Sequence, residues 1–246
     1  MKFHSLQAIL AVILSAPPAV AQLIQNDIGT HSMVFKYNDA AKIGQTKELK
    51  DYSNVHGQYL WSNDWHRAAF IMRTGNIVKM KAVKLNFYTN EVHYPGKEGE
   101  MAASIDKVKR IMLYSNDPSD TTALVATFEV LPNNTTHQDF LYEVMNEGRV
   151  QLLKRVRISA NKMRIDPIQS QETYYFYQSA DYAIRSANAI TEIKSLKKVH
   201  VFEAVPIASS GTEWFSANKW LSGNKNKLKN EKEVVDFINY LNSRNK

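Results

Sequence analysis

The sequence lacks cysteine altogether, and apart from a short stretch near its start it has no long apolar run. Without cysteine, disulfide bonds and thiolate metal sites are excluded, so the folded state must depend on an ordinary hydrophobic core. The apolar fraction of 44% is slightly below the globular norm of about 45–50% and is too high for a disordered chain. At 246 residues, the chain is long enough for one large β-rich domain or two small ones.

The first 21 residues have the pattern of a cleavable secretory signal peptide. Lys2 supplies a positive charge, and the apolar stretch Leu6–Leu14 follows it. This stretch is well short of the ~20 residues that a transmembrane helix needs. Ala19 and Ala21 place small side chains where signal peptidase requires them. We therefore predict cleavage after Ala21 and an exported protein, periplasmic or extracellular, that is soluble and keeps no integral membrane segment.

The charge of the chain is only mildly positive, at +7, and Lys2 leaves with the signal peptide. Lysine and arginine alternate with apolar residues, as in Lys79–Lys81 and Lys154–Arg157, which is typical of the solvent faces of strands. Dispersed charge on an exported chain does not favour nucleic acid as a partner. It leaves open an attraction to anionic envelope polymers or lipid headgroups.

The chain divides into an arm, two β regions and a helical end. Residues 22–55 are polar and irregular, and we interpret them as an N-terminal arm that lies on the body. Residues 56–115 and 116–195 consist of short apolar or alternating runs separated by turn residues, typical of antiparallel hairpins in one sheet system or two. The clearest turn is Asn146–Arg149, whose glycine can adopt a positive φ. The predicted fold class is α+β, an antiparallel β-sheet meander with one or two helices within residues 196–246.

Two helices are predicted in the C-terminal segment. Apolar spacing predicts the first over Leu196–Val205. The second begins after Asn230, whose side chain can accept a hydrogen bond from the Glu233 amide. We expect Asn239 and Asn242 to face away from the body and to contribute little. The second helix should fold only by packing its apolar stripe on the sheet, because so short a helix is marginal alone. That stripe consists of Val234, Phe237, Ile238 and Leu241.

The seven histidines show no metal-binding spacing. The densest group is His56, Asp64 and His66, with His93 expected near a neighbouring strand. None of these falls in an H-x-H, H-E-x-x-H or H-x-x-E-H pattern that would place two ligands on one face. Glycine-rich nucleotide-binding motifs are absent as well. We predict no metal and no cofactor.

Motifs for catalysis are also missing. Glycan hydrolysis needs two carboxylates about 5–10 Å apart, and nothing in the sequence singles out such a pair. The strand-borne candidates are Glu91, Glu129, Glu143, Glu172 and Glu192. No G-x-S-x-G motif occurs, and Ser209–Gly211 is interpreted as a connector. We assign no catalytic residue.

Four aromatic residues are the best candidates for contact with a ligand or partner. Trp61 and Trp65 flank a short polar segment, and Tyr175 and Tyr177 share one face of a strand by alternation. Exposed rings of this kind stack on sugars or peptides and anchor interfaces. The alternative, which is the more usual outcome, is that these rings pack on the two sides of a central strand.

Five segments carry recognisable motifs: Thr74–Val92, Phe140–Lys154, Tyr174–Tyr175, Lys194–Val199 and Asn230–Asn242. Their order resembles that in uncharacterised exported proteins common in Bacteroidota. Those proteins have a Leu-Asn-x-Tyr-x-Asn-Glu hairpin, a strand with a glycine and a Leu-Leu-Lys run, a tyrosine-rich strand, a lysine-rich segment and a C-terminal helix. The resemblance implies a Gram-negative periplasmic or secreted setting and supplies no catalytic residue.

We interpret the protein as a non-enzymatic exported β-rich protein that binds another envelope component, either a protein or a glycan. The alternative is a hydrolase of envelope glycan or peptide whose carboxylates come together only in the fold. A third hypothesis, a carrier of lipid or another small ligand, requires a cavity that the sequence does not reveal.

Overall fold

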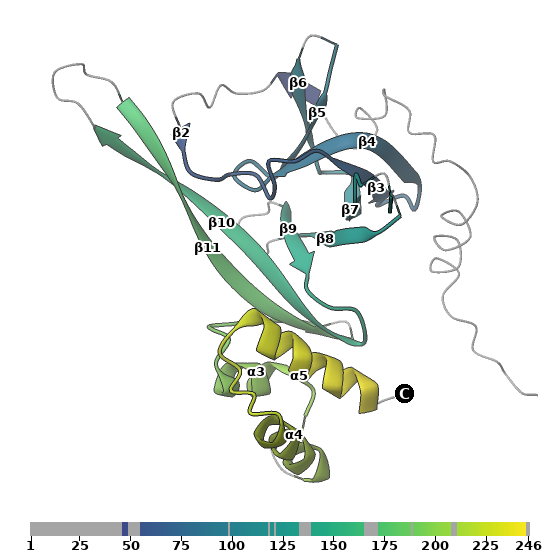
Figure 1. Cartoon of the computed structure of the whole chain (residues 1–246), viewed down its shortest axis with the longest axis vertical. Coiled ribbons are helices and arrows are strands. Elements are labelled where there is room, and N and C mark those ends of the chain that lie inside the picture. The colour runs from purple at the N-terminus through teal and green to yellow at the C-terminus, as the bar shows by residue number, and fades with distance from the viewer. Residues whose placement is uncertain are drawn as a thin grey trace, which may run out of the picture. The chain divides into compact units, whose positions relative to one another are not determined.

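The computed structural model describes residues 46–48, 55–97, 99–117, 119–120, 122–132, 139–164, 172–187, 189–207 and 211–244, all within the unit Phe35–Lys246. These residues form twelve strands and three helices, labelled as in Figure 1. The strands are β1 (Thr46–Glu48), β2 (Val55–His56), β3 (His66–Met72), β4 (Ile77–Asn86), β5 (Glu91–Pro95), β6 (Glu100–Ser104), β7 (Val108–Tyr114), β8 (Leu124–Pro132), β9 (Asp139–Val144), β10 (Val150–Arg164), β11 (Glu172–Ser186) and β12 (Ala189–Ile193). The helices are α3 (Lys198–Ala204), α4 (Thr212–Gly223) and α5 (Glu231–Arg244).

All the described strands belong to one sheet, in the order β1-β6-β5-β4-β3-β7-β8-β9-β10-β11-β12, with β2 placed beside β11. Neighbours in this order are antiparallel, whereas β2 pairs with β11 in parallel. The antiparallel sheet followed by C-terminal helices is therefore confirmed. The described chain has three helices instead of the one or two expected. The pairing of β7 with β8 joins the two β regions into a single sheet.

Strand β4 is the corner at which the sheet folds over itself (Figure 1). Its first half pairs with β3, where Ile77 lies opposite Ile71, and its second half pairs with β5, where Leu85 lies opposite Val92. A register shift in β3 just after His66 interrupts the pairing where the two halves diverge, as bulges commonly do at bends. One strand thereby contributes to two layers.

The two layers enclose the first hydrophobic core. Phe70, Ile111 and Phe128 on β3, β7 and β8 are fully buried in the same cluster as Leu85 of β4. The Phe128 ring lies 5.9 Å from the ring of Phe87, which follows β4. Alternation along each strand sends these side chains to one face.

A second core lies where the helices cover the open end of the β10–β11 hairpin. Val150 and Leu152 of β10 and Ile184 of β11 are buried there together with residues of all three helices. The Phe237 ring on α5 stacks on Phe202 of α3 at 5.3 Å. The expected packing of the C-terminal helix against the sheet is confirmed.

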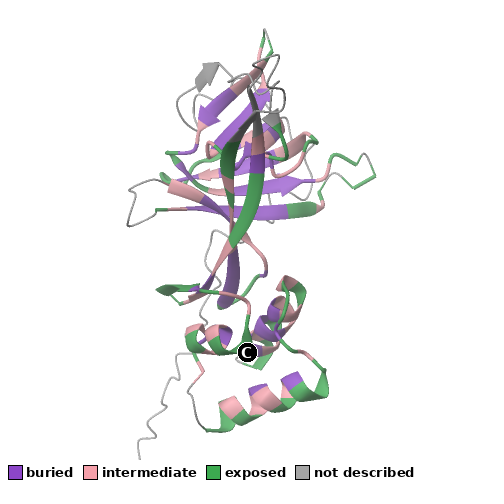
Figure 2. Ribbon diagram, turned by 90° about the vertical axis from the view of Figure 1, so that its left-hand side faces the viewer, coloured by how far each residue is buried: buried purple, intermediate pink, exposed green. Residues whose placement is uncertain are grey.

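The β10–β11 hairpin connects the two cores. Its pairing runs without interruption from Val150 opposite Ser186 to Arg164 opposite Glu172. On the same face as Val150 and Leu152, the side chains of Val156 and Ile158 pack against the first core. Figure 2 shows exposed positions, in green, along the part of the hairpin beyond this contact. One pair of strands therefore carries side chains of both cores.

The predicted cap of α5 is present. The Glu233 amide donates to Asn230 Oδ1 at 2.9 Å, and Glu233 Oε2 accepts from the amides of Lys227 and Lys229 at 2.9 and 3.1 Å. These bonds fix the start of α5. The members of its stripe are all buried: Val234, Phe237, Ile238 and Leu241.

Helix α4 was not predicted from the sequence. It begins immediately after Gly211, at the end of the segment expected to be only a connector. Of its residues only Ala217 and Leu221 are buried. Its apolar stripe is therefore too narrow for the spacing of apolar residues in the sequence to indicate a helix. Within the described residues, no helix has the length and apolarity needed to cross a membrane.

Several strands differ from the expected ones in extent. Residues Thr46–Glu48, inside the segment expected to be irregular, form β1 and pair with β6. Strand β11 continues to Ser186, although the sequence predicted a strand only to Tyr177. The added part begins with Gln178–Ala180, which is exposed and small or polar, so alternation gave no signal there.

The second core predicts the cost of changing α5. Phe237→Ala should lower the free energy of unfolding by about 3–5 kcal/mol, because Phe237 is fully buried and its loss leaves a cavity. Asn239→Ala, on the exposed side of the same helix, is the control and should cost less than about 0.5 kcal/mol. Urea unfolding curves measure both; equal effects would show that α5 does not pack on the hairpin.

Candidate binding pocket

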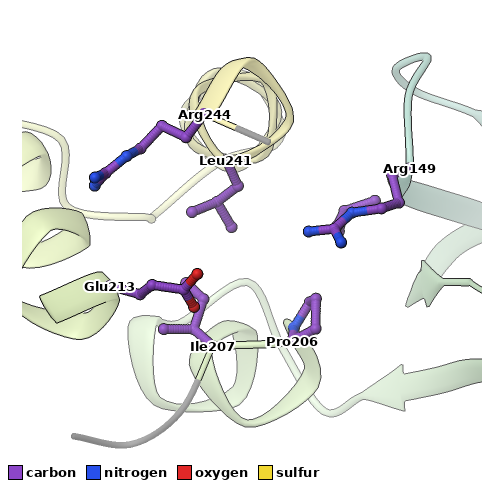
Figure 3. Close-up of a pocket in the computed structure, with 7 residues that line it drawn as sticks. Arg149, Pro206, Ile207, Glu213, Leu241 and Arg244 are labelled. Carbon is purple, nitrogen blue, oxygen red and sulfur yellow. The ribbon is translucent and has the colours of Figure 1, made fainter. Parts of the chain in front are cut away.

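A cavity of about 100 Å³ opens where the helices meet the turn between β9 and β10 (Figure 3). Four parts of the chain line it. Arg149 and Val150 lie at the start of β10, Pro206 and Ile207 follow α3, Glu213 is in the first turn of α4, and Leu241 and Arg244 are near the end of α5. The pocket therefore forms only when the helices and the hairpin are assembled.

The turn that carries Arg149 is held by two asparagine side chains. Asn242 of α5 accepts from the Val150 amide at 2.9 Å and donates to the Val150 carbonyl at 2.8 Å and the Glu147 carbonyl at 3.3 Å. Asn146 donates to the Val150 carbonyl at 3.0 Å and accepts from the Leu152 amide at 2.8 Å. The expectation that Asn242 faces away from the body is therefore wrong, because the turn reaches this side of α5.

Gly148 permits this close approach. Its φ of +128° lies in the region that favours glycine, and an added Cβ would stand 2.4 Å from Asn242 Nδ2. The predicted positive φ in this turn is confirmed. A larger residue here would displace the Asn242 side chain from the turn, and the positive φ would strain it as well.

The charged groups of the pocket are unevenly balanced. Two guanidinium groups, of Arg149 and Arg244, accompany one carboxylate, of Glu213. In Figure 3, Arg149 and Glu213 extend into the pocket from opposite walls, and Leu241 lies between them. Arg244 Nη1 donates to the Tyr240 hydroxyl at 2.9 Å. Within the described part of the chain, no hydrogen bond or ion pair occupies the Arg149 side chain.

Arg149 is unusual among the arginines of this fold. Most of the other described arginines form an ion pair with a carboxylate: Arg73, Arg110, Arg155, Arg157 and Arg185. Arg73, for example, borders an open hollow of about 660 Å³ at the β3–β4 turn, but its guanidinium is engaged by Asp139 at 2.7 Å. Arg149 is exposed and has no partner among the described residues, so its guanidinium is available to an anion from outside.

The four aromatic residues singled out from the sequence lie elsewhere, and none lines the pocket. The Trp61 ring meets Phe128 edge-on at 5.6 Å, so it packs at the margin of the first core. Lys84 Nζ lies 4.3 Å from the centre of the Trp65 ring. Tyr175 stacks on the His56 ring at 5.1 Å, and Tyr177 is 46% exposed.

The histidines make separate contacts. His93 is fully buried, with Nδ1 2.7 Å from Glu100 Oε1 and Nε2 3.0 Å from Asn86 Nδ2. Burial lowers the pKa of His93, and the opposing effect of Glu100 does not cancel this. His66 meets the Trp61 ring edge-on at 5.3 Å. In the described part of the chain, no group of three or more histidine, aspartate or glutamate residues could hold a metal ion.

The strand-borne carboxylates are also outside the pocket. Glu129 contacts Arg110 and Arg185. Burial alone would raise the pKa of Glu129, but hydrogen bonds from these two arginines outweigh it and lower the pKa. Glu192 is exposed, and the side chain of Glu172 lies outside the described residues. Glu129 is thus engaged in holding β7, β8 and β11 together.

A polar cluster links the start of α5 to the hairpin. Lys154 Nζ lies 2.8 Å from Glu231 Oε1, and the Tyr182 hydroxyl donates to the same oxygen at 2.6 Å. Burial would raise the pKa of Glu231, but the hydrogen bonds from Lys154 and Tyr182 lower it. Burial raises the pKa of nearby Glu143, and Lys154 offsets only part of this.

The pocket could not be found from sequence alone. The sequence predicted the turn at Asn146–Arg149, and the arginine that follows its glycine was the available sign of a charged group there. Glu213 and Leu241 are distant from Arg149 in the sequence. Helix α4, which carries Glu213, was not predicted. No protein-family model, curated protein or solved structure matches the chain.

Asn242→Ala should cost about 1–3 kcal/mol of unfolding free energy, because it leaves backbone groups of Glu147 and Val150 without this partner. Asn239→Ala is the matched control, since the same change on the exposed side of α5 removes no contact to the turn. Chemical unfolding measures the free energy of unfolding of both variants. Equally small losses would show that Asn242 does not hold the turn.

Glu231→Gln and Glu143→Gln should alter the pH dependence of stability in opposite directions. The folded pKa of Glu231 lies below its ordinary value of 4.5, so its contribution is present above that value and is lost as the pH falls through the folded pKa. The folded pKa of Glu143 is raised, so its contribution is present below 4.5 and is lost as the pH rises through the folded pKa.

Urea unfolding between about pH 3 and pH 7 tests this pair. The stability difference between wild type and Glu231→Gln should grow with pH, and the difference between wild type and Glu143→Gln should shrink. Two differences that change in the same direction would show that the assigned pKa directions are wrong.

Proposed function

We propose that this protein is a non-enzymatic, exported binding protein that holds another envelope component, a protein or a glycan, in the pocket at Arg149. The observation that carries the proposal is an arginine that has no partner among the described residues and stands on a turn held by Asn146 and Asn242. Because these asparagines already hold the backbone of the turn, the turn itself loses little freedom when a ligand binds to the exposed Arg149, which favours affinity.

The lining of the pocket supports binding more than catalysis. Hydrolysis of a glycosidic bond in the usual way needs two carboxylates across the bond, and Glu213 is the one carboxylate among the lining residues. Glu129 and Glu231 are each engaged by two hydrogen-bond donors. Pro206 and Ile207 instead add accessible apolar surface to the pocket that Arg149 lines, a combination suited to recognition.

Export is part of the proposal. Its support is the leader with Ala19 and Ala21 before the expected cut, together with the resemblance to exported proteins of Bacteroidota. In this setting the ligand belongs to the envelope or to the medium outside the cell.

Site-specific photo-crosslinking in the expressing cell tests the proposal. A photoreactive phenylalanine analogue at Ile207, which lines the pocket, should form a defined adduct with an envelope component. The same analogue at Val125, which is 46% exposed on β8, is the control and should not form it. Combining Ile207 labelling with Arg149→Gln should remove the adduct, since only the charge at the pocket changes. Equal adducts at both positions, or none at Ile207, would contradict the proposal.

A further inference from the structure

We infer that the ligand of this pocket is the C-terminal end of a peptide chain, with its free carboxylate on Arg149 and its last apolar side chain beside Leu241 and Ile207. This inference rests on the proposed function and narrows it to one ligand class.

The size of the pocket favours the end of a longer molecule. Sites that enclose a whole small ligand have volumes of about 300–1,000 Å³, whereas this cavity measures about 100 Å³. It has room for one small apolar side chain and the group next to it. A cofactor or an intact lipid would leave most of its surface outside.

The charges of the pocket favour a single carboxylate. Arg149 offers a planar fork of donors that matches the two oxygens of a carboxylate. The positive charges of Arg149 and Arg244 exceed the negative charge of Glu213 by one, which balances a ligand with one negative charge. A phosphate group carries nearly two negative charges and would be repelled more strongly by Glu213.

The apolar lining and Glu213 account for the rest of a terminal residue. Pro206 is exposed and Ile207 is partly exposed, so these two residues present apolar surface to a ligand. Val150 and Leu241 are buried and support that surface from within the core. Figure 3 shows Glu213 on the wall opposite Arg149, where a carboxylate oxygen can accept from the last peptide N–H. A chain end thus finds partners for its carboxylate, its side chain and its amide.

An NMR titration of the whole chain with short peptides tests the inference. The probe is N-acetyl-alanyl-valine with a free carboxylate, and its C-terminal amide is the matched control. The free acid should bind at least about tenfold more tightly than the amide, and its shifts should centre on the amides of residues 149–150 and 241–244. Arg149→Gln should weaken binding of the acid about tenfold. Arg157→Gln is the control for that substitution, because Arg157 is exposed on β10 and outside the pocket.

The outcomes separate this inference from the proposed function. Equal binding of acid and amide, or tighter binding of inorganic phosphate or free valine than of the acid, would overturn the peptide-end assignment. No binding of any of these probes, together with an Arg149-dependent crosslink at Ile207, would overturn the ligand class and leave the binding function standing. If the crosslink is absent as well, both fail.

Discussion

The long pairing between β10 and β11 is the interaction on which both hydrophobic cores depend. The same face of β10 buries Val150 and Leu152 against the helices and packs Val156 and Ile158 against the folded-over sheet. Three short helices with little apolar surface are marginal alone. The hairpin supplies the surface that they cover, and the helices in turn remove its open end from water.

The pocket follows from this arrangement. Because α5 lies along the start of β10 and buries Phe237, the flank of the helix that carries Asn242 meets the β9–β10 turn, and Asn242 satisfies backbone groups of that turn. Gly148 allows α5 and the turn to approach closely, and Arg149, the next residue, therefore lies beside the helices. The site is thus a consequence of how the two cores are joined, and a ligand bound there would stabilise the junction.

The general fold could be read from local patterns, and the site could not. Turn residues and alternation located most strands, and the cap at Asn230 and the stripe around Phe237 located α5, because each signal lies within a few residues. Helix α4 was not predicted, because only Ala217 and Leu221 mark its buried side. Asn242 was expected to face away from the body, since helical spacing shows which residues form the apolar stripe and says nothing about a turn that lies beside that stripe. The pocket combines such distant contacts, so no local pattern contains it.

Native-state hydrogen exchange measures most directly whether the hairpin and the helices form one cooperative unit. The informative amides are those of Leu152 in β10, which donates to Asn146, and of Phe237 and Ile238 in α5, all of them at buried positions. Their opening free energies should converge to one value as denaturant is added, since loss of the helices uncovers Val150 and Leu152. If the α5 amides open at low free energy while Leu152 keeps full protection, the helices are a separate unit and the account is wrong.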